Sequence, residues 1–212
     1  MDTLGLFPLG IVLFPESVLP LHIFEDRYKV LIKECIDSGK IFGINLIESS
    51  KLHNIGCSAE VAELFQVFDD GKMDILVRGL KRFKVKHFTE STYGYFIGKV
   101  EYFQDADDEI EEYVLMDCIE KYNIIVDNLV DLKIEKLDIL NIKTKMPSFL
   151  IAQKAGLALL QKQTLLEIHS ENKRLLFLQD HLTKILPMVR EAEHVSKIVR
   201  NDGYYNPFNF RG

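Results

Sequence analysis

The sequence of 212 residues contains no tryptophan and only three cysteines. The apolar stretch near its start, residues 4–15, is interrupted by glycine and proline and falls short of the roughly 18 residues that a membrane-spanning helix requires. No cationic segment precedes this stretch, so a secretory signal is not indicated. Cys35, Cys57 and Cys118 are odd in number and widely spaced, which disfavours a disulfide framework. We therefore expect a cytoplasmic protein with reduced cysteines.

The motifs of nucleotide hydrolysis, metal binding and nucleophilic catalysis are also absent. There is no Gly-x-x-x-x-Gly-Lys-Ser/Thr loop, and the histidines and cysteines show neither His-Glu-x-x-His nor Cys-x-x-Cys spacing. Ser58 lacks the second glycine of a nucleophile elbow, and Ser148 follows a proline at a predicted helix start, where capping is the better explanation. For His22, between two apolar residues, we expect a structural hydrogen bond rather than catalysis. The sequence predicts a non-enzymatic protein without cofactor or metal.

Acidic residues outnumber basic ones, 32 to 26, and the net charge of −6 gives no general attraction to nucleic acids or anionic membranes. One segment, residues 78–87, is basic and contains no acid. On an extended strand its alternate cations share one face and its apolar residues the other, as in any half-buried strand, and no aromatic residue interleaves with the cations for base stacking. We favour a solvated face and keep RNA binding as the alternative, with the candidate cations Arg78, Lys81, Arg82, Lys84 and Lys86.

Up to residue 103 the sequence is typical of short strands rich in Val, Ile, Phe and Leu, separated by glycine, proline, aspartate or serine. Because Asp70 and Gly71 tolerate positive φ, we expect a hairpin at this point, and Gly79 should mark the next turn. The predicted strands are residues 4–9, 18–21, 42–47, 59–68, 73–78, 83–88 and 95–103.

One helix is expected among these strands. Acidic residues at positions 25 and 26 suit a helix amino terminus, and Gly39 is a typical stop. The apolar positions between them recur on one face, so this helix should pack against the sheet.

The acidic segment 104–112 predicts a boundary between a strand domain, residues 1–104, and a helical domain, residues 105–200. Beyond the boundary, apolar residues recur at helical spacing between positions 114 and 129. Pro147 indicates the start of a further helix.

The last predicted helix begins after Ser170, a plausible amino-terminal cap, and carries an apolar seam over residues 175–192. Pro187 lies inside this seam, so the helix should kink or restart near residues 184–186. Residues 201–212 form a tail with four aromatic residues. We expect the tail to fold back onto the protein, and contact with a partner is the alternative.

A series of motifs runs through the sequence in a specific order. In residues 6–28 three prolines separate short apolar strands from a charged helix start. The later motifs are Phe-Gly plus an apolar strand at 42–47, a glycine-led strand start at 55–61, the hairpin at 70–72, Gly-x-x-Arg-Phe at 79–83, Lys-Gln-x-Leu-Leu-Glu at 162–167 and Arg-Leu at 174–175. This order resembles the amino-terminal, substrate-binding domain of Lon proteases over roughly the whole chain. Departures from the family pattern are Glu16 in place of glycine, Asp26 in place of proline and Cys57 in place of threonine.

The resemblance implies an α+β fold: an amino-terminal PUA-like β-barrel with one packed helix, then an α-helical bundle with a long last helix. It also implies a non-catalytic module that binds exposed polypeptide segments or a protein partner, with an adaptor role in proteolysis. The ATPase and peptidase motifs of Lon proteases do not occur in these residues, so we expect a stand-alone recognition domain.

Candidate partner-binding residues are Phe24, Arg27 and Tyr28 near the first helix, and Arg82 and Phe83 on the basic strand. Each also has an ordinary packing or capping interpretation. The expected mechanism is apolar burial with a polar rim in a groove between barrel and helices. The seam at residues 175–192 predicts packing within the chain, and the oligomeric state is not indicated.

Overall fold

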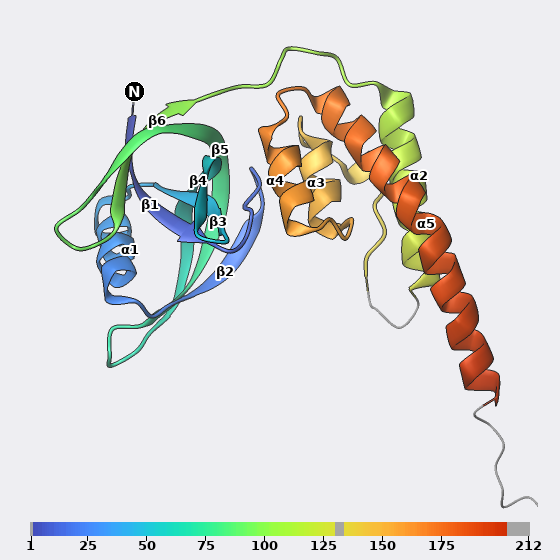
Figure 1. Cartoon of the computed structure of the whole chain (residues 1–212), viewed down its shortest axis with the longest axis horizontal. Coiled ribbons are helices and arrows are strands. Elements are labelled where there is room, and N and C mark those ends of the chain that lie inside the picture. Colours follow the sequence, from blue (N-terminus) through green and yellow to red (C-terminus); the bar gives the residue numbers. More distant parts are fainter. Residues whose placement is uncertain (1, 130–133, 203–212) are drawn as a thin grey trace, which may run out of the picture.

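The computed structural model describes residues 2–129 and 134–202 and shows a strand-rich half followed by a helical half (Figure 1). The predicted aromatic tail, residues 204–210, lies outside the described residues. The strands are β1 (Asp2–Leu9), β2 (Val18–Ile23), β3 (Phe42–Glu48), β4 (Lys51–Val67), β5 (Met73–Glu90) and β6 (Phe96–Tyr102). The helices are α1 (Asp26–Ser38), α2 (Glu112–Asn128), the 3-10 turn η1 (Ile139–Asn141), α3 (Pro147–Lys154), α4 (Leu159–Glu167) and α5 (Glu171–Asp202). The predicted α+β class is confirmed.

The six strands form one mixed sheet in the order β2-β5-β4-β3-β1-β6. β1 pairs with β3 in parallel, and the other neighbouring strands are antiparallel. A further pairing between β5 and β6 closes the sheet on itself. The predicted helix α1 packs its apolar face into the core of this half, and Gly39 ends it in the left-handed conformation with φ 64°.

The predicted hairpin is confirmed, because β4 and β5 pair in antiparallel register up to Val67 and Met73, and Gly71 has φ 78°. The predicted start of β4 at residue 59 is wrong, since the strand begins at Lys51. The predicted turn at Gly79 is also wrong, because β5 runs unbroken through it.

Gly79 serves close packing rather than a turn. A Cβ atom at this position would lie 2.1 Å from the backbone oxygen of Phe14. Its amide donates to Ser17 O at 2.8 Å, and its carbonyl accepts from Glu16 N at 2.9 Å. Glu16, at the position where the family pattern has glycine, adopts the left-handed conformation with φ 62°.

α2 follows the predicted periodicity, and so does the first part of α5, but the seam predicted over residues 175–192 is incomplete because Ala192 is exposed. α2 and α5 pack against each other, while α4 contacts β4 of the strand half (Figure 1). Ser170 caps α5 as predicted, accepting a hydrogen bond from Lys173 N at 3.2 Å. The expected restart near Pro187 does not occur, because α5 continues through it. The predicted boundary near residue 104 falls between β6 and α2, and the division into two domains stays a prediction.

A buried ion cluster joins the two halves. Arg82 on β5 donates to the carbonyls of Leu166 at 2.9 Å and Ile168 at 2.6 Å, and it pairs with Asp105. Arg174 on α5 binds both oxygens of Asp105, at 2.8 Å to Oδ1, which Arg82 also binds, and at 2.5 Å to Oδ2. Both arginines are buried. Strand half, linking segment and helical half are therefore held together by one carboxylate between two guanidinium groups.

Ser148 and Glu171 complete this ion cluster. The Ser148 hydroxyl donates to Glu171 Oε2 at 2.8 Å and accepts from Arg174 Nε at 2.8 Å. The predicted capping role of Ser148 is therefore wrong: it is the second residue of α3, and its hydroxyl belongs to the cluster. Next to the ion cluster, the Phe149 ring stacks on Phe14 of the strand half with a centroid distance of 5.2 Å. The apolar core therefore continues from one half into the other.

Asp105 should make the stability of the ion cluster between the two halves depend on pH in the acidic range. Burial alone would raise its pKa, but hydrogen bonds and charge from Arg174 and Arg82 outweigh burial and hold the pKa below the ordinary value of 3.8. A carboxyl group whose pKa is lower in the folded state than in the unfolded state stabilises the fold fully at pH values above the unfolded-state pKa. This stabilisation is lost as the pH falls through the folded-state pKa. The free energy of unfolding should fall below pH 3.8. Urea titrations at a series of pH values measure this dependence. As the pH falls, the free energy of unfolding should decrease less for Asp105→Asn than for the native chain, whereas Asp107→Asn should behave like the native chain. The same pH dependence in all three proteins would show that Asp105 is not its cause.

Candidate functional site

Apolar side chains are exposed where β2 and β4 end. Phe24 directly follows β2 and is 59% exposed, and Phe65 and Val67 at the end of β4 are 54% and 58% exposed. Val67 pairs with Met73, which in turn pairs with Ile23, the residue before Phe24. The two exposed segments therefore lie at the same end of the sheet.

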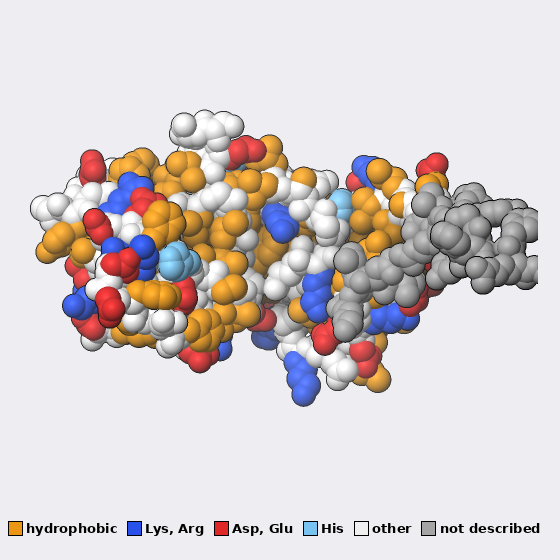
Figure 2. Space-filling model, turned by 90° about the horizontal axis from the view of Figure 1, so that it is seen from below, with side chains coloured by type: hydrophobic (Ala, Val, Ile, Leu, Met, Phe, Trp, Pro, Cys, Tyr) orange, Lys and Arg blue, Asp and Glu red, His pale blue; other side chains and the backbone are white. Residues whose placement is uncertain are grey.

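Two further rings connect these segments. The His22 ring stacks with Phe24 at a centroid distance of 6.2 Å and meets Phe68 edge-on at 5.9 Å. His22 Nδ1 lies 2.6 Å from Asp74 Oδ1, which confirms its predicted structural hydrogen bond. We call His22, Phe24, Phe65, Val67 and Phe68 the Phe24 surface. Figure 2 shows this end of the strand half, with hydrophobic side chains among charged ones.

Charged groups border the Phe24 surface. A hollow of about 490 Å³ is lined by His22 and Phe68 together with Asp69, Asp70 and Lys72. Lys72 pairs with Asp70 at 2.6 Å, and the Lys72 hydrogen bonds hold the pKa of Asp70 below its usual value. An exposed apolar centre with a charged border is the arrangement found in protein-binding surfaces.

Three predicted site residues near α1 have different positions. Phe24 is exposed, and Arg27 is half-exposed, paired with Glu25 at 2.7 Å. Tyr28 is 4% exposed and stacks on Phe7 at 4.0 Å. In this structure Tyr28 therefore offers no side chain for direct contact with a partner.

The other two predicted site residues belong to the interior. Phe83 is fully buried in a cluster with Leu4, Leu6, Val85 and Val100. Arg82 is 4% exposed and belongs to the junction ion cluster. The prediction that Arg82 shares a solvated face with other cations is wrong, because its buried hydrogen bonds to the helical half compensate its charge.

The basic segment is interrupted by acidic partners. Arg78 pairs with Glu60 at 3.5 Å, Lys86 pairs with Glu101 and Arg82 pairs with Asp105. The remaining two candidate cations, Lys81 and Lys84, are exposed. A continuous cationic track, which RNA binding normally requires, is not formed. The structure gives the RNA alternative no support.

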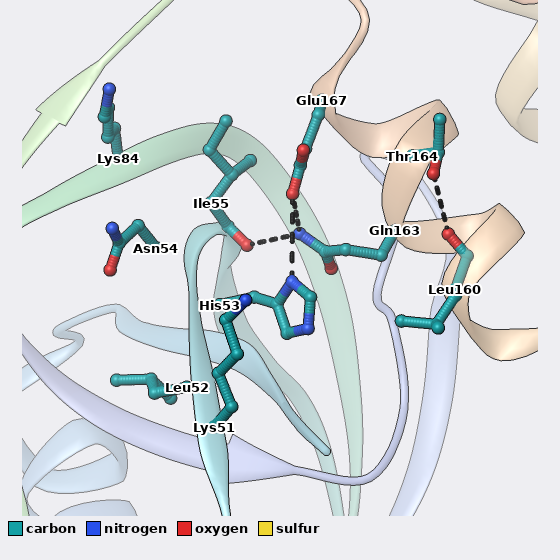
Figure 3. A pocket seen from close by; sticks show the side chains of 10 residues that line it. All are labelled: Lys51, Leu52, His53, Asn54, Ile55, Lys84, Leu160, Gln163, Thr164 and Glu167. Carbon is teal, nitrogen blue, oxygen red and sulfur yellow. Dashed lines mark hydrogen bonds and ion pairs between the residues drawn. The ribbon is translucent and has the colours of Figure 1, made fainter. Parts of the chain in front are cut away.

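A cleft of about 530 Å³ lies between β4 and α4, where a groove was expected (Figure 3). Its lining is mostly polar rather than apolar. Gln163 Nε2 donates to Ile55 O at 3.0 Å and to Glu167 Oε1 at 2.7 Å, and His53 Nδ1 lies 4.0 Å from the same Glu167 oxygen. The cleft is lined by Lys51, Leu52, His53, Asn54, Ile55, Lys84, Leu160, Gln163, Thr164 and Glu167.

The candidate nucleophiles have structural contacts. Ser58 exchanges hydrogen bonds of 3.1 Å with the backbone of Lys81, and Ser148 is bound within the ion cluster. The three cysteines are buried and unpaired, and burial raises the pKa of Cys35 to about 11. In the described part of the chain, no group of three or more histidine, cysteine or carboxylate side chains is placed to bind a metal. No helix in residues 2–129 or 134–202 is both long and apolar enough to cross a membrane.

Sequence reasoning missed the contribution of β4 to both surfaces. Phe65 and Val67 read as ordinary strand residues, and only their exposure marks them as surface groups. His53 and Asn54 precede the predicted strand, and no motif marks them. The available signal is the sequence at 64–68, Leu-Phe-Gln-Val-Phe, whose apolar residues fall on both alternating faces of a strand.

Solved structures with this fold are amino-terminal domains of Lon proteases. The Lon N-terminal domain protein from Xanthomonas campestris is 26% identical, with a TM-score of 0.66, and the match covers 84% of this chain and 97% of that one. The N-terminal domain of the Mycobacterium avium complex Lon protease is 16% identical, with a TM-score of 0.66 and coverage of 86% and 98%. The structure thus has the fold of the Lon N-terminal domain.

The sequence comparisons agree. The chain belongs to the ATP-dependent protease La (LON) substrate-binding domain family, which it matches over residues 3–184. It is 29% identical to the Lon protease of Buchnera aphidicola subsp. Acyrthosiphon pisum, over 93% of this chain and 27% of that protein. The Vibrio parahaemolyticus Lon protease is 22% identical, over 87% of this chain and 25% of that protein. The chain spans about a quarter of the length of these relatives, and the predicted family is confirmed.

Proposed function

We propose that this chain is a non-catalytic recognition module that binds exposed apolar segments of polypeptides at the Phe24 surface. The carrying observation is the exposure of Phe24, Phe65 and Val67 at one end of the sheet. Large apolar side chains exposed at one end of a sheet, with charged groups around them, favour reversible protein binding. Membership of a substrate-binding domain family supports this function.

Three finer statements belong to the same proposal. The closed ring of strands supports a PUA-like β-barrel as the architecture of the first half. The buried, unpaired cysteines support a cytoplasmic location. The Lon relatives support an adaptor role, in which bound segments are presented for proteolysis.

The double substitution Phe24→Ser/Phe65→Ser tests the binding surface. Because large apolar side chains dominate binding free energy, we expect about tenfold or greater loss of affinity for a permanently unfolded, carboxymethylated protein. Calorimetric titration measures the affinity, and circular dichroism verifies the fold.

Tyr113→Ser is the matched control, because Tyr113 is 78% exposed on the helical half. Affinity should stay unchanged in this variant. Equal affinities for the native chain and the Phe24→Ser/Phe65→Ser variant would refute the proposed surface.

A further inference from the structure

The β4–α4 cleft contains a stretch of strand backbone without a strand partner. The β4–β5 ladder ends at the pair Ile55–Lys84, beyond which β5 continues its pairing with β6. On its other side β4 bulges, because three of its residues, 53–55, face the single residue Leu46 of β3. His53 and Asn54 consequently pair with neither neighbouring strand. Unpaired strand segments of this kind readily accept an added strand.

Side-chain amides hold this bulge from two sides. Asn45 Nδ2 donates to His53 O, and Gln163 Nε2 donates to Ile55 O, each at 3.0 Å. Both side chains are at least 98% buried, yet their carbonyl oxygens, Asn45 Oδ1 and Gln163 Oε1, have no hydrogen-bond partner among the described residues. Of these two residues only Gln163 lines the cleft, so the two amides fix the shape of the bulge and keep its backbone in place beside the cleft.

The cleft lining carries two lysines and one carboxylate, and Glu48 and Glu101 lie opposite the two lysines on the neighbouring strands. Lys51 and Lys84 line the cleft, and in the described ranges neither forms an ion pair, although many other lysines of the chain do. Its only carboxylate, Glu167, accepts a hydrogen bond from Gln163. Figure 3 shows Lys84 on the same side of the bulge as Asn54, across from the helix. Anionic groups are therefore the complementary ligands.

We propose that the cleft binds an extended acidic peptide segment, which adds to β4 at His53 and Asn54 and places its carboxylates near Lys51 and Lys84. Asn45 already binds His53 O, so the added strand would pair with the other backbone groups of His53 and Asn54, which belong to neither ladder. Apart from His53, no aromatic ring lines the cleft, so base stacking is disfavoured and a peptide fits better than single-stranded RNA. This second site does not depend on the Phe24 surface.

The test uses fluorescence anisotropy with a labelled ten-residue peptide of alternating aspartate and valine. Lys51→Glu/Lys84→Glu should weaken binding about tenfold or more, because it reverses both cleft charges. The matched control, Lys40→Glu/Lys81→Glu, makes the same change in net charge at exposed lysines outside the cleft. An equal loss in both variants, or no binding by the native chain, would overturn the site.

Two further probes test the mode of binding. A peptide N-methylated at alternate residues lacks the donors that strand addition needs, so its affinity should fall by a similar factor. Unchanged affinity would overturn strand addition. If a twelve-nucleotide oligouridylate binds the native chain more tightly than the peptide does, and Lys51→Glu/Lys84→Glu loses this binding, the cleft is an RNA site and the peptide proposal is overturned. Retention of peptide binding by Phe24→Ser/Phe65→Ser separates this site from the proposed function.

Discussion

Replacing Arg174 by methionine should lower the free energy of unfolding by about 3–5 kcal/mol, since it breaks a buried charge network by removing one partner. Arg174 is fully buried and binds Asp105, Glu171 and Ser148. Without its guanidinium, Glu171 keeps the hydrogen bonds from Ser148 but loses its only ion-pair partner among the described residues. The cost comes mainly from the carboxylate left buried rather than from the attraction that is lost.

Urea titration followed by circular dichroism measures this loss, and Lys173→Met is the control because Lys173 is the exposed neighbour on α5. The control should stay within about 0.5 kcal/mol of the native chain. Adding Glu171→Gln to Arg174→Met removes the orphaned charge, so the double variant should recover part of the stability. A single variant as stable as the native chain would show that the cluster does not hold the two halves together.

The sequence predicts best those features that depend on near neighbours. The apolar period of α1, the hairpin at Gly71 and the Ser170 cap each follow from a few consecutive residues, and the structure confirms them. Gly79 was misread because its reason is a backbone contact with Phe14, 65 positions earlier in the chain. A glycine that a turn requires and one that close packing requires look alike in sequence.

The candidate site shows the same limit. Strand alternation places Arg82 on the solvent face, but the helical half covers that part of β5. The helical half supplies two carbonyls to the Arg82 guanidinium, and the linking segment supplies Asp105. Phe24 was identified and is exposed, whereas Tyr28, four residues later, is buried against Phe7. The burial of Arg82 depends on how the two halves pack together, which local pattern does not encode, whereas Tyr28 lies on the apolar face of α1 that packs into the core of its own half.

Phe83 was a candidate for partner contact, and its burial leads to a different expectation. Its ring is fully buried with Leu6 and Val100 and lies over Gly43, where a Cβ atom would come within 2.6 Å of the ring. Removing an aromatic ring from a packed core costs about 3–5 kcal/mol, because the cavity collapses only in part. Phe83→Ala should therefore lower the free energy of unfolding by this amount.

The same variant separates stability from recognition. Domains are commonly stable by about 5–15 kcal/mol, so Phe83→Ala should stay folded at low temperature, where its affinity for the carboxymethylated protein should equal that of the native chain. Lys81→Ala, an exposed neighbour on β5, should change neither quantity. If Phe83→Ala instead kept native stability and lost binding, Phe83 would contact the bound polypeptide directly. The strand half would then have to open to expose its ring. The measured pair of values, unfolding free energy and affinity, thus decides between a core residue and a contact residue.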